Sequence, residues 1–200
     1  MRLLLATKNK GKVEELRHLL GGLKFEIDSL LDHPEIPDVD EDGATFVDNA
    51  RKKAVFASKA ASCFALADDS GLVVDALGGR PGVQSARYAG EGHDYAANNT
   101  KLLEEMKFVP DGKRGSAFVC SMVLVAPDGR EWAVEGRTEG VIGFELIGNG
   151  GFGYDPLFFI PSEGKTMAEL PMERKNAISH RGRALAQMRE ILVAIIEKGK

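Results

Sequence analysis

The sequence has no long hydrophobic run, no excess of basic residues and no patterned cysteines. No apolar stretch approaches the roughly 20 residues of a membrane-spanning helix, and the apolar part of its first eight residues is too short for a signal peptide. The formal net charge is −4, whereas proteins that bind nucleic acid in bulk usually carry a basic excess. Its two cysteines, Cys63 and Cys120, lack metal-ligating or redox spacing. We therefore expect a cytoplasmic protein with reduced thiols that binds neither membrane nor nucleic acid.

Glycine is what the sequence has in excess, with 23 of 200 residues against an average usage of about 7%. The hydrophobic fraction of 44% is ordinary, and a chain of this length can bury a core without disulfides or a structural metal. Apolar periodicity predicts helices at residues 12–20, 45–61, 94–106 and 181–198. It predicts strands at residues 2–6, 24–28, 64–67, 72–76, 116–126, 131–137 and 157–160. This order favours an α/β fold with a mixed sheet, in a single domain that spans residues 1–200.

A lysine-rich loop lies between the first predicted strand and the first predicted helix, and its sequence is Thr7-Lys8-Asn9-Lys10-Gly11-Lys12. The first N–H groups of a helix lack partners, and the helix dipole adds about half a positive charge there. Three lysines within five residues repel one another, so a polyphosphate that neutralises them would stabilise the loop. A capped helix with a solvated basic loop explains the same residues equally well.

Two acidic clusters are candidates for a metal site. Asp68-Asp69-Ser70-Gly71 follows a predicted strand, and strand ends in α/β sheets open onto ligand-binding crevices. If the chain stays extended there, the two carboxylates point to opposite sides, so that one faces a ligand and the other braces the loop. The second cluster comprises Asp38, Asp40, Glu41 and Asp42. One carboxylate from each cluster could hold a Mg²⁺ ion. The alternatives are a turn at residues 68–71 and a solvated acidic loop at residues 38–42.

A basic set surrounds the start of the last predicted helix, and it comprises Lys175, His180, Arg181 and Arg183. Arginine at the start of a helix opposes the helix dipole, so its placement calls for an anion or a purine carbonyl. Ordinary charge on a helix surface is the alternative interpretation.

Two glycine motifs resemble nucleotide-binding signatures without meeting their requirements. Residues 148–153 fit G-x-G-x-x-G, but Asp155, Pro156 and an extended apolar run follow where a dinucleotide site needs a helix. Residues 164–166 resemble the end of a P-loop, but Phe159 occupies the position of its first glycine. We therefore expect neither a dinucleotide site nor a P-loop.

Six motifs occur in order over nearly the whole chain. The first three are Thr7-Lys8-Asn9-Lys10-Gly11-Lys12, Glu41-Asp42-Gly43-Ala44-Thr45-Phe46 with Asn49-Ala50 and Lys53-Ala54, and Ala67-Asp68-Asp69-Ser70-Gly71-Leu72. The other three are Leu77-Gly78-Gly79-Arg80-Pro81-Gly82 with Ser85-Ala86-Arg87-Tyr88, Gly150-Gly151-Phe152-Gly153-Tyr154-Asp155-Pro156, and Lys175 with Ser179-His180-Arg181-Gly182. Together they closely resemble the inosine triphosphate pyrophosphatase family. One departure is Lys8, where many members carry glycine, and we expect it to alter charge rather than abolish function.

The resemblance implies an elongated α/β fold of two lobes, with a mixed sheet, flanking helices and a central cleft, that usually forms a homodimer. It also implies Mg²⁺-dependent hydrolysis of ITP, dITP and XTP to the nucleoside monophosphate and pyrophosphate, which keeps deaminated purines out of nucleic acids. Asp69 would be the proton acceptor and a metal ligand, and Asp40 or Glu41 would supply the other ligand. The implied substrate-binding residues are Thr7, Lys8, Asn9, Lys10, Gly11, Lys12, Lys53, Ser70, Phe152, Gly153, Tyr154, Asp155, Lys175, His180 and Arg181.

Three other functions fit parts of the pattern. A related pyrophosphatase could act on other modified bases. A non-catalytic sensor would bind ITP without releasing pyrophosphate. A nucleic-acid repair accessory would bind DNA with strong salt dependence, which the negative net charge disfavours.

Overall fold

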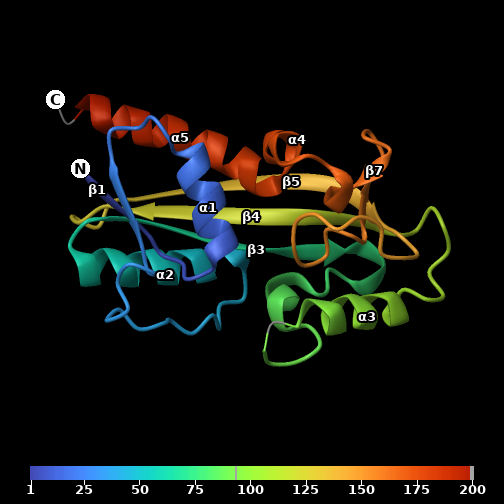
Figure 1. Cartoon of the computed structure of the whole chain (residues 1–200). Helices are drawn as coiled ribbons and strands as arrows, with labels where there is room; N and C mark the ends of the chain where they lie inside the picture. Colours follow the sequence, from blue (N-terminus) through green and yellow to red (C-terminus); the bar gives the residue numbers. More distant parts are fainter. Residues whose placement is uncertain (93, 199–200) are drawn as a thin grey trace. The chain divides into compact units, whose positions relative to one another are not determined.

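A computed structural model describes residues 1–92 and 94–198 of the chain (Figure 1). The helices are α1 (Lys10–Leu19), α2 (Phe46–Ala61), α3 (Tyr95–Glu105), α4 (Met172–Ile178) and α5 (His180–Lys198), with short 3₁₀ helices η1 (Asp75–Leu77), η2 (Gly82–Arg87) and η3 (Met167–Glu169). The strands are β1 (Arg2–Leu5), β2 (Glu26–Ser29), β3 (Phe64–Val74), β4 (Gly115–Val125), β5 (Glu131–Ile142), β6 (Phe158–Ile160) and β7 (Lys165–Thr166). No helix in this described part is both long and apolar enough to cross a membrane.

The strands of the described residues form one seven-stranded sheet in the order β2-β1-β3-β4-β5-β6-β7. Strand β1 runs parallel to both β2 and β3. Strand β6 runs antiparallel to both β5 and β7. Parallel and antiparallel pairs therefore share one sheet, and this confirms the predicted mixed α/β fold.

The chain divides into two compact units. Unit 1 comprises Met1–Asp69, Cys120–Gly136 and Gly182–Lys200, and unit 2 comprises Ser70–Val119 and Arg137–Arg181. Strands β3, β4 and β5 pass from one unit to the other along the chain. The elongated outline and the central cleft stay predictions.

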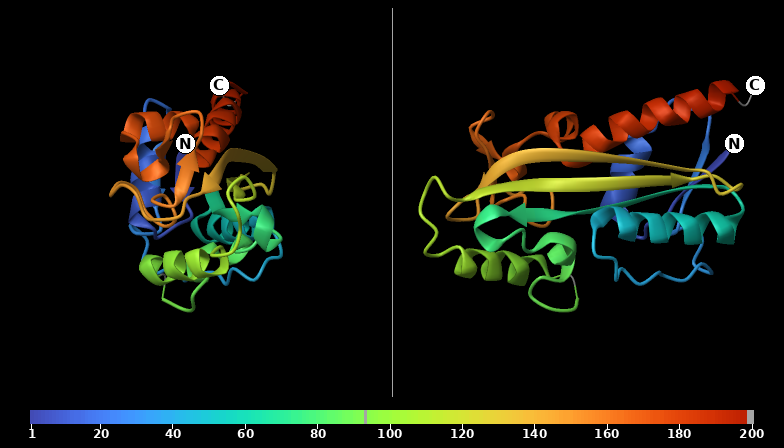
Figure 2. Two further views of the ribbon diagram at one scale, coloured as in Figure 1. Left: turned by 90° about the vertical axis from the view of Figure 1, so that its right-hand side faces the viewer. Right: turned by 180° about the vertical axis from the view of Figure 1, so that it is seen from behind.

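In unit 1, helices cover both faces of the sheet. Alternate residues of a strand point to opposite faces, and accordingly Leu3 and Leu5 pack with residues of α1 and α5, whereas Leu4 packs with α2. Figures 1 and 2 show α1 and α5 on one side of β1 and β3 and α2 on the other. Thr45 caps α2 by accepting the Asp48 N–H at 3.2 Å, as its position before an apolar stripe predicts.

Unit 2 packs around Phe158, a fully buried side chain of β6. Leu102 of α3 and Met106, which directly follows that helix, contribute to this core. Phe118 of β4 lies against the Phe158 ring with 4.4 Å between centroids. Residues 148–154, which follow β5, form a loop, and a strand follows them rather than a helix. The predicted extended segment after this loop is therefore confirmed.

The boundaries of several elements differ from those predicted. Helix α1 begins at Lys10, two residues before the predicted start, because Asn9 caps it. Strand β5 continues to Ile142, five residues beyond the predicted end, because it goes on to pair with β6. The short helix α4 was not predicted, since its seven residues are too few to show a clear apolar period.

Candidate active site

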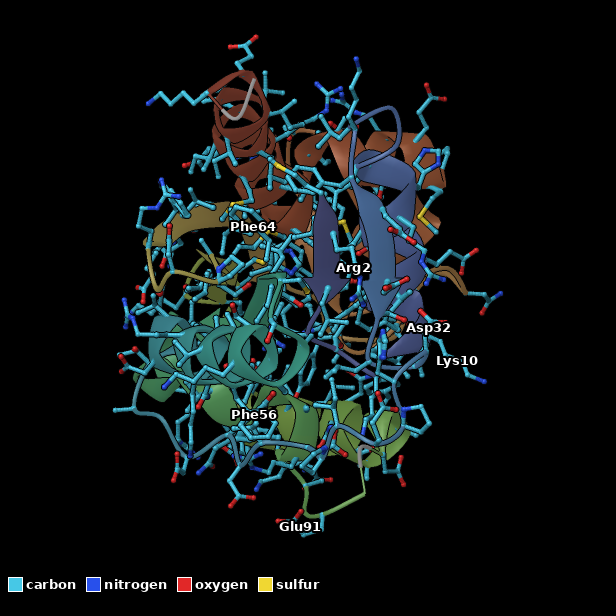
Figure 3. All side chains as sticks on the ribbon, turned by 90° about the vertical axis from the view of Figure 1, so that its left-hand side faces the viewer. Arg2, Lys10, Asp32, Phe56, Phe64 and Glu91 are labelled. Carbon is cyan, nitrogen blue, oxygen red and sulfur yellow. The ribbon has the colours of Figure 1, made fainter. Side chains whose placement is uncertain are left out.

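The lysine-rich loop forms the start of α1. Asn9 caps the helix, with its side chain accepting the Lys12 N–H at 3.1 Å, and Thr7 Oγ1 accepts the Asn9 N–H at 3.2 Å. Lys10 and Gly11 occupy the first turn and are exposed. Figure 3 shows the Lys10 side chain pointing away from the fold. The helix is therefore capped, as the alternative interpretation predicted. The same residues also carry the lysines of the predicted anion-binding loop, so capping does not argue against anion binding.

Two of the lysines reach acidic groups of unit 1. Lys12 Nζ lies 3.0 Å from Asp68 Oδ2, and the Asp68 side chain is almost fully buried. Lys53 Nζ, from α2, donates to Glu41 Oε1 at 2.5 Å and to the Asp68 carbonyl oxygen at 2.8 Å. Segments far apart in the chain therefore bring cations and carboxylates together, as the predicted meeting of the basic and acidic loops requires.

Asp68 and Asp69 lie in the middle of a strand. The predicted strand end after Ala67 and the alternative turn at residues 68–71 are both wrong, because β3 runs unbroken from Phe64 to Val74. The extended backbone directs the two carboxylates to opposite faces, as expected for adjacent residues. Asp68 meets Lys12 of α1, and Asp69 Oδ2 accepts a hydrogen bond of 3.0 Å from Asn49 Nδ2 of α2.

Burial and neighbouring charge oppose each other at this site. Burial raises the pKa of Asp69, while the charge of Lys53 and the hydrogen bond from Asn49 oppose the rise. Burial lowers the pKa of Lys53, but the carboxylates, led by that of Glu41, outweigh it and leave this pKa above its ordinary value. Lys53 therefore keeps its positive charge beside a carboxyl group that burial makes more basic.

The second acidic cluster divides into exposed and half-buried members. Asp40 is exposed, whereas Glu41 is half-buried and its charge is one of the influences that raise the pKa of Asp69. Asp38 lies 3.1 Å from Lys8 Nζ, and Asp42 lies 2.7 Å from Lys52 Nζ. Within the described residues, no group of three or more His, Cys, Asp or Glu side chains is arranged to hold a metal.

Two carboxylates still suit one kind of metal. Mg²⁺ keeps several waters and is usually bound by one or two carboxylates together with substrate phosphates. Glu41 and Asp69 supply oxygen ligands of this type, and Lys12 and Lys53 lie among the same carboxylates, where phosphates would neutralise them. The donor set would therefore suit Mg²⁺ together with an anionic ligand better than a metal held by protein alone.

A second group of predicted residues gathers in unit 2. Asp155 Oδ2 accepts hydrogen bonds from Lys175 Nζ at 2.8 Å and from the Phe152 N–H at 3.0 Å. The side chains of Asp155 and Lys175 are each only 6% exposed. Burial raises the pKa of Asp155, and Lys175 opposes that rise. This pair fixes the glycine-rich loop to α4.

Aromatic and cationic groups surround Phe152. Lys175 Nζ and Arg181 Cζ lie 5.1 and 5.6 Å from the centroid of its ring. The buried ring of His180 stacks on Phe118, with 4.8 Å between centroids. The interpretation of the basic set as ordinary surface residues is wrong for Lys175, His180 and Arg181, which are buried. It holds for Arg183, which is exposed.

The rest of the loop is held from neighbouring elements. The Tyr154 hydroxyl donates to the Ser85 carbonyl at 2.8 Å, and Asn99 Nδ2 donates to the Gly153 carbonyl at 2.9 Å. Ser70 is half-buried in β3 and belongs to unit 2, although it directly follows Asp69. The predicted site residues thus form two clusters, one in each unit.

Asn49 belongs to one of the six sequence motifs, but no role was predicted for it, and the structure shows that it contacts the Asp69 carboxylate directly. Asn49 lies three residues after Phe46 and next to Ala50, which both belong to the predicted apolar stripe of the helix at residues 45–61. A polar side chain on such a stripe is buried and needs hydrogen-bond partners. That signal was present in the sequence, but the identity of the partner was not.

Comparisons with known proteins identify the family and support the fold. The chain belongs to the Ham1 family, whose pattern matches residues 3–191. It is 54% identical over 191 residues to the dITP/XTP pyrophosphatase of Geobacter sulfurreducens, covering 96% of each chain. It is 46% identical over 197 residues to the dITP/XTP pyrophosphatase of Listeria monocytogenes, covering 98% of this chain and 97% of the relative. A HAM1 protein structure from Coxiella burnetii superposes with a TM-score of 0.90 at 40% identity, covering 97% of this chain and 99% of that one.

Proposed function

We propose that the protein hydrolyses non-standard purine nucleoside triphosphates, namely dITP, XTP and ITP, to the monophosphate and pyrophosphate. Such an enzyme removes deaminated purines from the nucleotide pool. The names of the relatives support dITP and XTP as substrates. The observation that carries the proposal is the meeting of Lys12 and Lys53 with Glu41, Asp68 and Asp69 in unit 1.

We assign Asp69 as the proton acceptor for the attacking water. Its burial raises the pKa of its carboxyl group, which makes the carboxylate a better proton acceptor than an exposed aspartate. Lys12 and Lys53, together with the first N–H groups of α1, hold the leaving pyrophosphate and offset its growing negative charge. Such preorganised electrostatics usually make the largest contribution to phosphoryl chemistry.

Glu41 and Asp69 are the residues that we propose as ligands for Mg²⁺. When bound, the ion neutralises phosphate charge and lowers the pKa of a coordinated water. Glu41 is preferred to Asp40 because Asp40 is exposed, whereas Glu41 is half-buried against Lys53.

Hydrogen-bond donors of unit 2 provide the proposed selectivity for the base. Hypoxanthine and xanthine present a carbonyl where adenine presents an amine. Lys175 and Arg181 only donate, so they suit the carbonyl and leave adenine mismatched. A site built on hydrogen bonds can reject a wrong group by about 10⁴-fold. Phe152 lies beside both cations and offers a face for stacking on the purine.

We also propose that the protein works as a cytoplasmic homodimer, and sedimentation would test its assembly.

The test is pyrophosphate release from dITP, XTP, ITP, dATP and dGTP, with and without Mg²⁺. We expect turnover of dITP, XTP and ITP, only with Mg²⁺, and none of dATP. The proposed donors also match the carbonyl of guanine, so turnover of dGTP would place them as keto-purine contacts without selectivity against guanine. Asp69→Asn should lower kcat by about 10²–10⁴-fold, the usual contribution of a general base. The matched control, Asp42→Asn, removes a carboxylate of the same acidic loop and should leave turnover unchanged. Tight dITP binding without pyrophosphate release would instead indicate a sensor, and full activity of Asp69→Asn would remove Asp69 from the mechanism.

A further inference from the structure

We propose that Asn49 is a positioning residue that holds the acidic loop and the Asp69 carboxylate in the relative positions that a divalent cation needs. The inference rests on the proposed function, because it concerns the two carboxylates assigned to the metal. It adds a residue that does not itself contact substrate or metal.

The contacts of Asn49 join these two parts of the site. Its Oδ1 accepts the Gly43 N–H at 2.7 Å, and its Nδ2 donates to Asp69 Oδ2 at 3.0 Å. Gly43 is only two residues after Glu41, so one amide links the backbone of the acidic loop to the catalytic carboxylate. The side chain of Asn49 lies in the first turn of α2 and is fully buried.

The chemistry of the position requires asparagine. One end of the side chain must accept from a backbone N–H and the other must donate to a carboxylate, and an amide provides both groups. Aspartate could keep the bond to Gly43 but would place a second carboxylate against Asp69. Glycine at position 43 allows the close approach, since a Cβ there would lie 2.6 Å from Asn49 Oδ1 and 3.0 Å from Asp48 Cβ.

The hydrogen bonds of Asn49 should affect metal binding rather than nucleotide binding. A hydrogen bond to one carboxylate oxygen restricts rotation of the Asp69 head group, and partners of this kind commonly alter metal affinity or activity by 10–100-fold. We therefore expect Asn49→Ala to weaken metal binding and kcat together. The KM for dITP at saturating Mg²⁺ should change by less than about threefold.

Asn98 offers a matched control for a merely structural role. It is also a buried asparagine near the start of a helix, and its amide likewise links two backbone segments. Its Oδ1 accepts the Ala89 N–H at 2.7 Å, and its Nδ2 donates to the Ala86 carbonyl at 3.1 Å. No acidic side chain is among these partners. Asn98→Ala should therefore lower stability as Asn49→Ala does, without affecting the metal.

The experiment measures Mn²⁺ binding to the nucleotide-free proteins by electron paramagnetic resonance, together with melting temperatures and kcat and KM for dITP. We expect Mn²⁺ affinity to fall at least tenfold in Asn49→Ala and less than twofold in Asn98→Ala. Asn49→Ser, which keeps a small polar group but cannot reach Asp69, provides the second variant and should behave like Asn49→Ala.

Two results would overturn the inference. One is wild-type Mn²⁺ affinity in both Asn49 variants, and the other is an equal loss in Asn98→Ala. Failure of the proposed function is a separate result, because it shows as absent pyrophosphate release by the wild-type protein whatever the Mn²⁺ comparison gives.

Discussion

Replacing Lys175 by methionine should destabilise the protein strongly, because it leaves the buried Asp155 carboxylate without its countercharge. In the intact protein this carboxylate accepts from Lys175 Nζ at 2.8 Å and from the Phe152 N–H at 3.0 Å. Both charged side chains are 6% exposed, so water cannot replace the lost ammonium group. Removing one partner of a buried ion pair typically lowers the free energy of unfolding by about 3–5 kcal/mol. For a chain of this size, that corresponds to a fall of about 6–20 °C in melting temperature.

The stability lost in Lys175→Met should increase as pH rises. Burial raises the pKa of Asp155 and Lys175 opposes the rise, so Lys175→Met raises this pKa further. An aspartate whose pKa is raised in the folded state binds a proton more readily there than in the unfolded chain. Stability is therefore lost as pH rises from the unfolded pKa through the folded pKa. The difference in unfolding free energy between wild type and variant should widen from pH 4.5 to pH 7.5.

Urea denaturation of the nucleotide-free proteins at these two pH values provides the measurement. Lys52→Met serves as the control, because the pair of Lys52 with Asp42 has side chains that are 42% and 73% exposed. Exposed pairs contribute little, so this variant should match the wild type at both pH values. Equal effects of the two substitutions, or a loss in Lys175→Met that is the same at both pH values, would refute the reasoning.

Two further substitutions test other parts of the molecule. Arg114→Met should lower the free energy of unfolding by at least about 3 kcal/mol in urea denaturation, because the buried guanidinium donates to the carbonyls of four residues and its removal takes a donor from each of them. A loss below about 1 kcal/mol would contradict this. Asp38→Asn should lower the KM for dITP by about two- to fivefold in steady-state assays, since it releases Lys8 from an exposed ion pair of 3.1 Å. The same substitution in a Lys8→Gly background should have no effect, and an equal gain there would exclude Lys8 as the cause.

Local signals in the sequence predicted the elements that depend on local interactions. The helix at residues 45–61 was predicted from Thr45, which caps it, and from its alanine stripe, and α2 begins and ends within one residue of that range. The lysine-rich loop and the acidic residues could also be recognised as candidates from their clustered charges, although solvated loops explained the same residues. Their pairing could be expected only once the resemblance to a family was taken into account.

The continuous strand β3 was not predictable in the same way. Asp68-Asp69-Ser70-Gly71 has the composition of a turn, and such residues are depleted in strands. The strand persists because partners from outside the strand satisfy its carboxylates, with Lys12 on one face and Asn49 on the other. Tertiary contacts of this kind override local preference, and a site that needs two carboxylates inside a sheet is a place where the local rule fails.

The charges of unit 1 are paired before any ligand arrives, and this constrains how a nucleotide can bind. Lys12 and Lys53 already lie against carboxylates, so they do not repel one another in the free protein. A triphosphate that bound alone would gain the lysines but would face Glu41 and Asp69, whose charges would then repel it. A divalent cation removes that repulsion, because it is neutralised by carboxylates and phosphates together. The proposed function therefore predicts that nucleotide and cation each strengthen the binding of the other by the same factor.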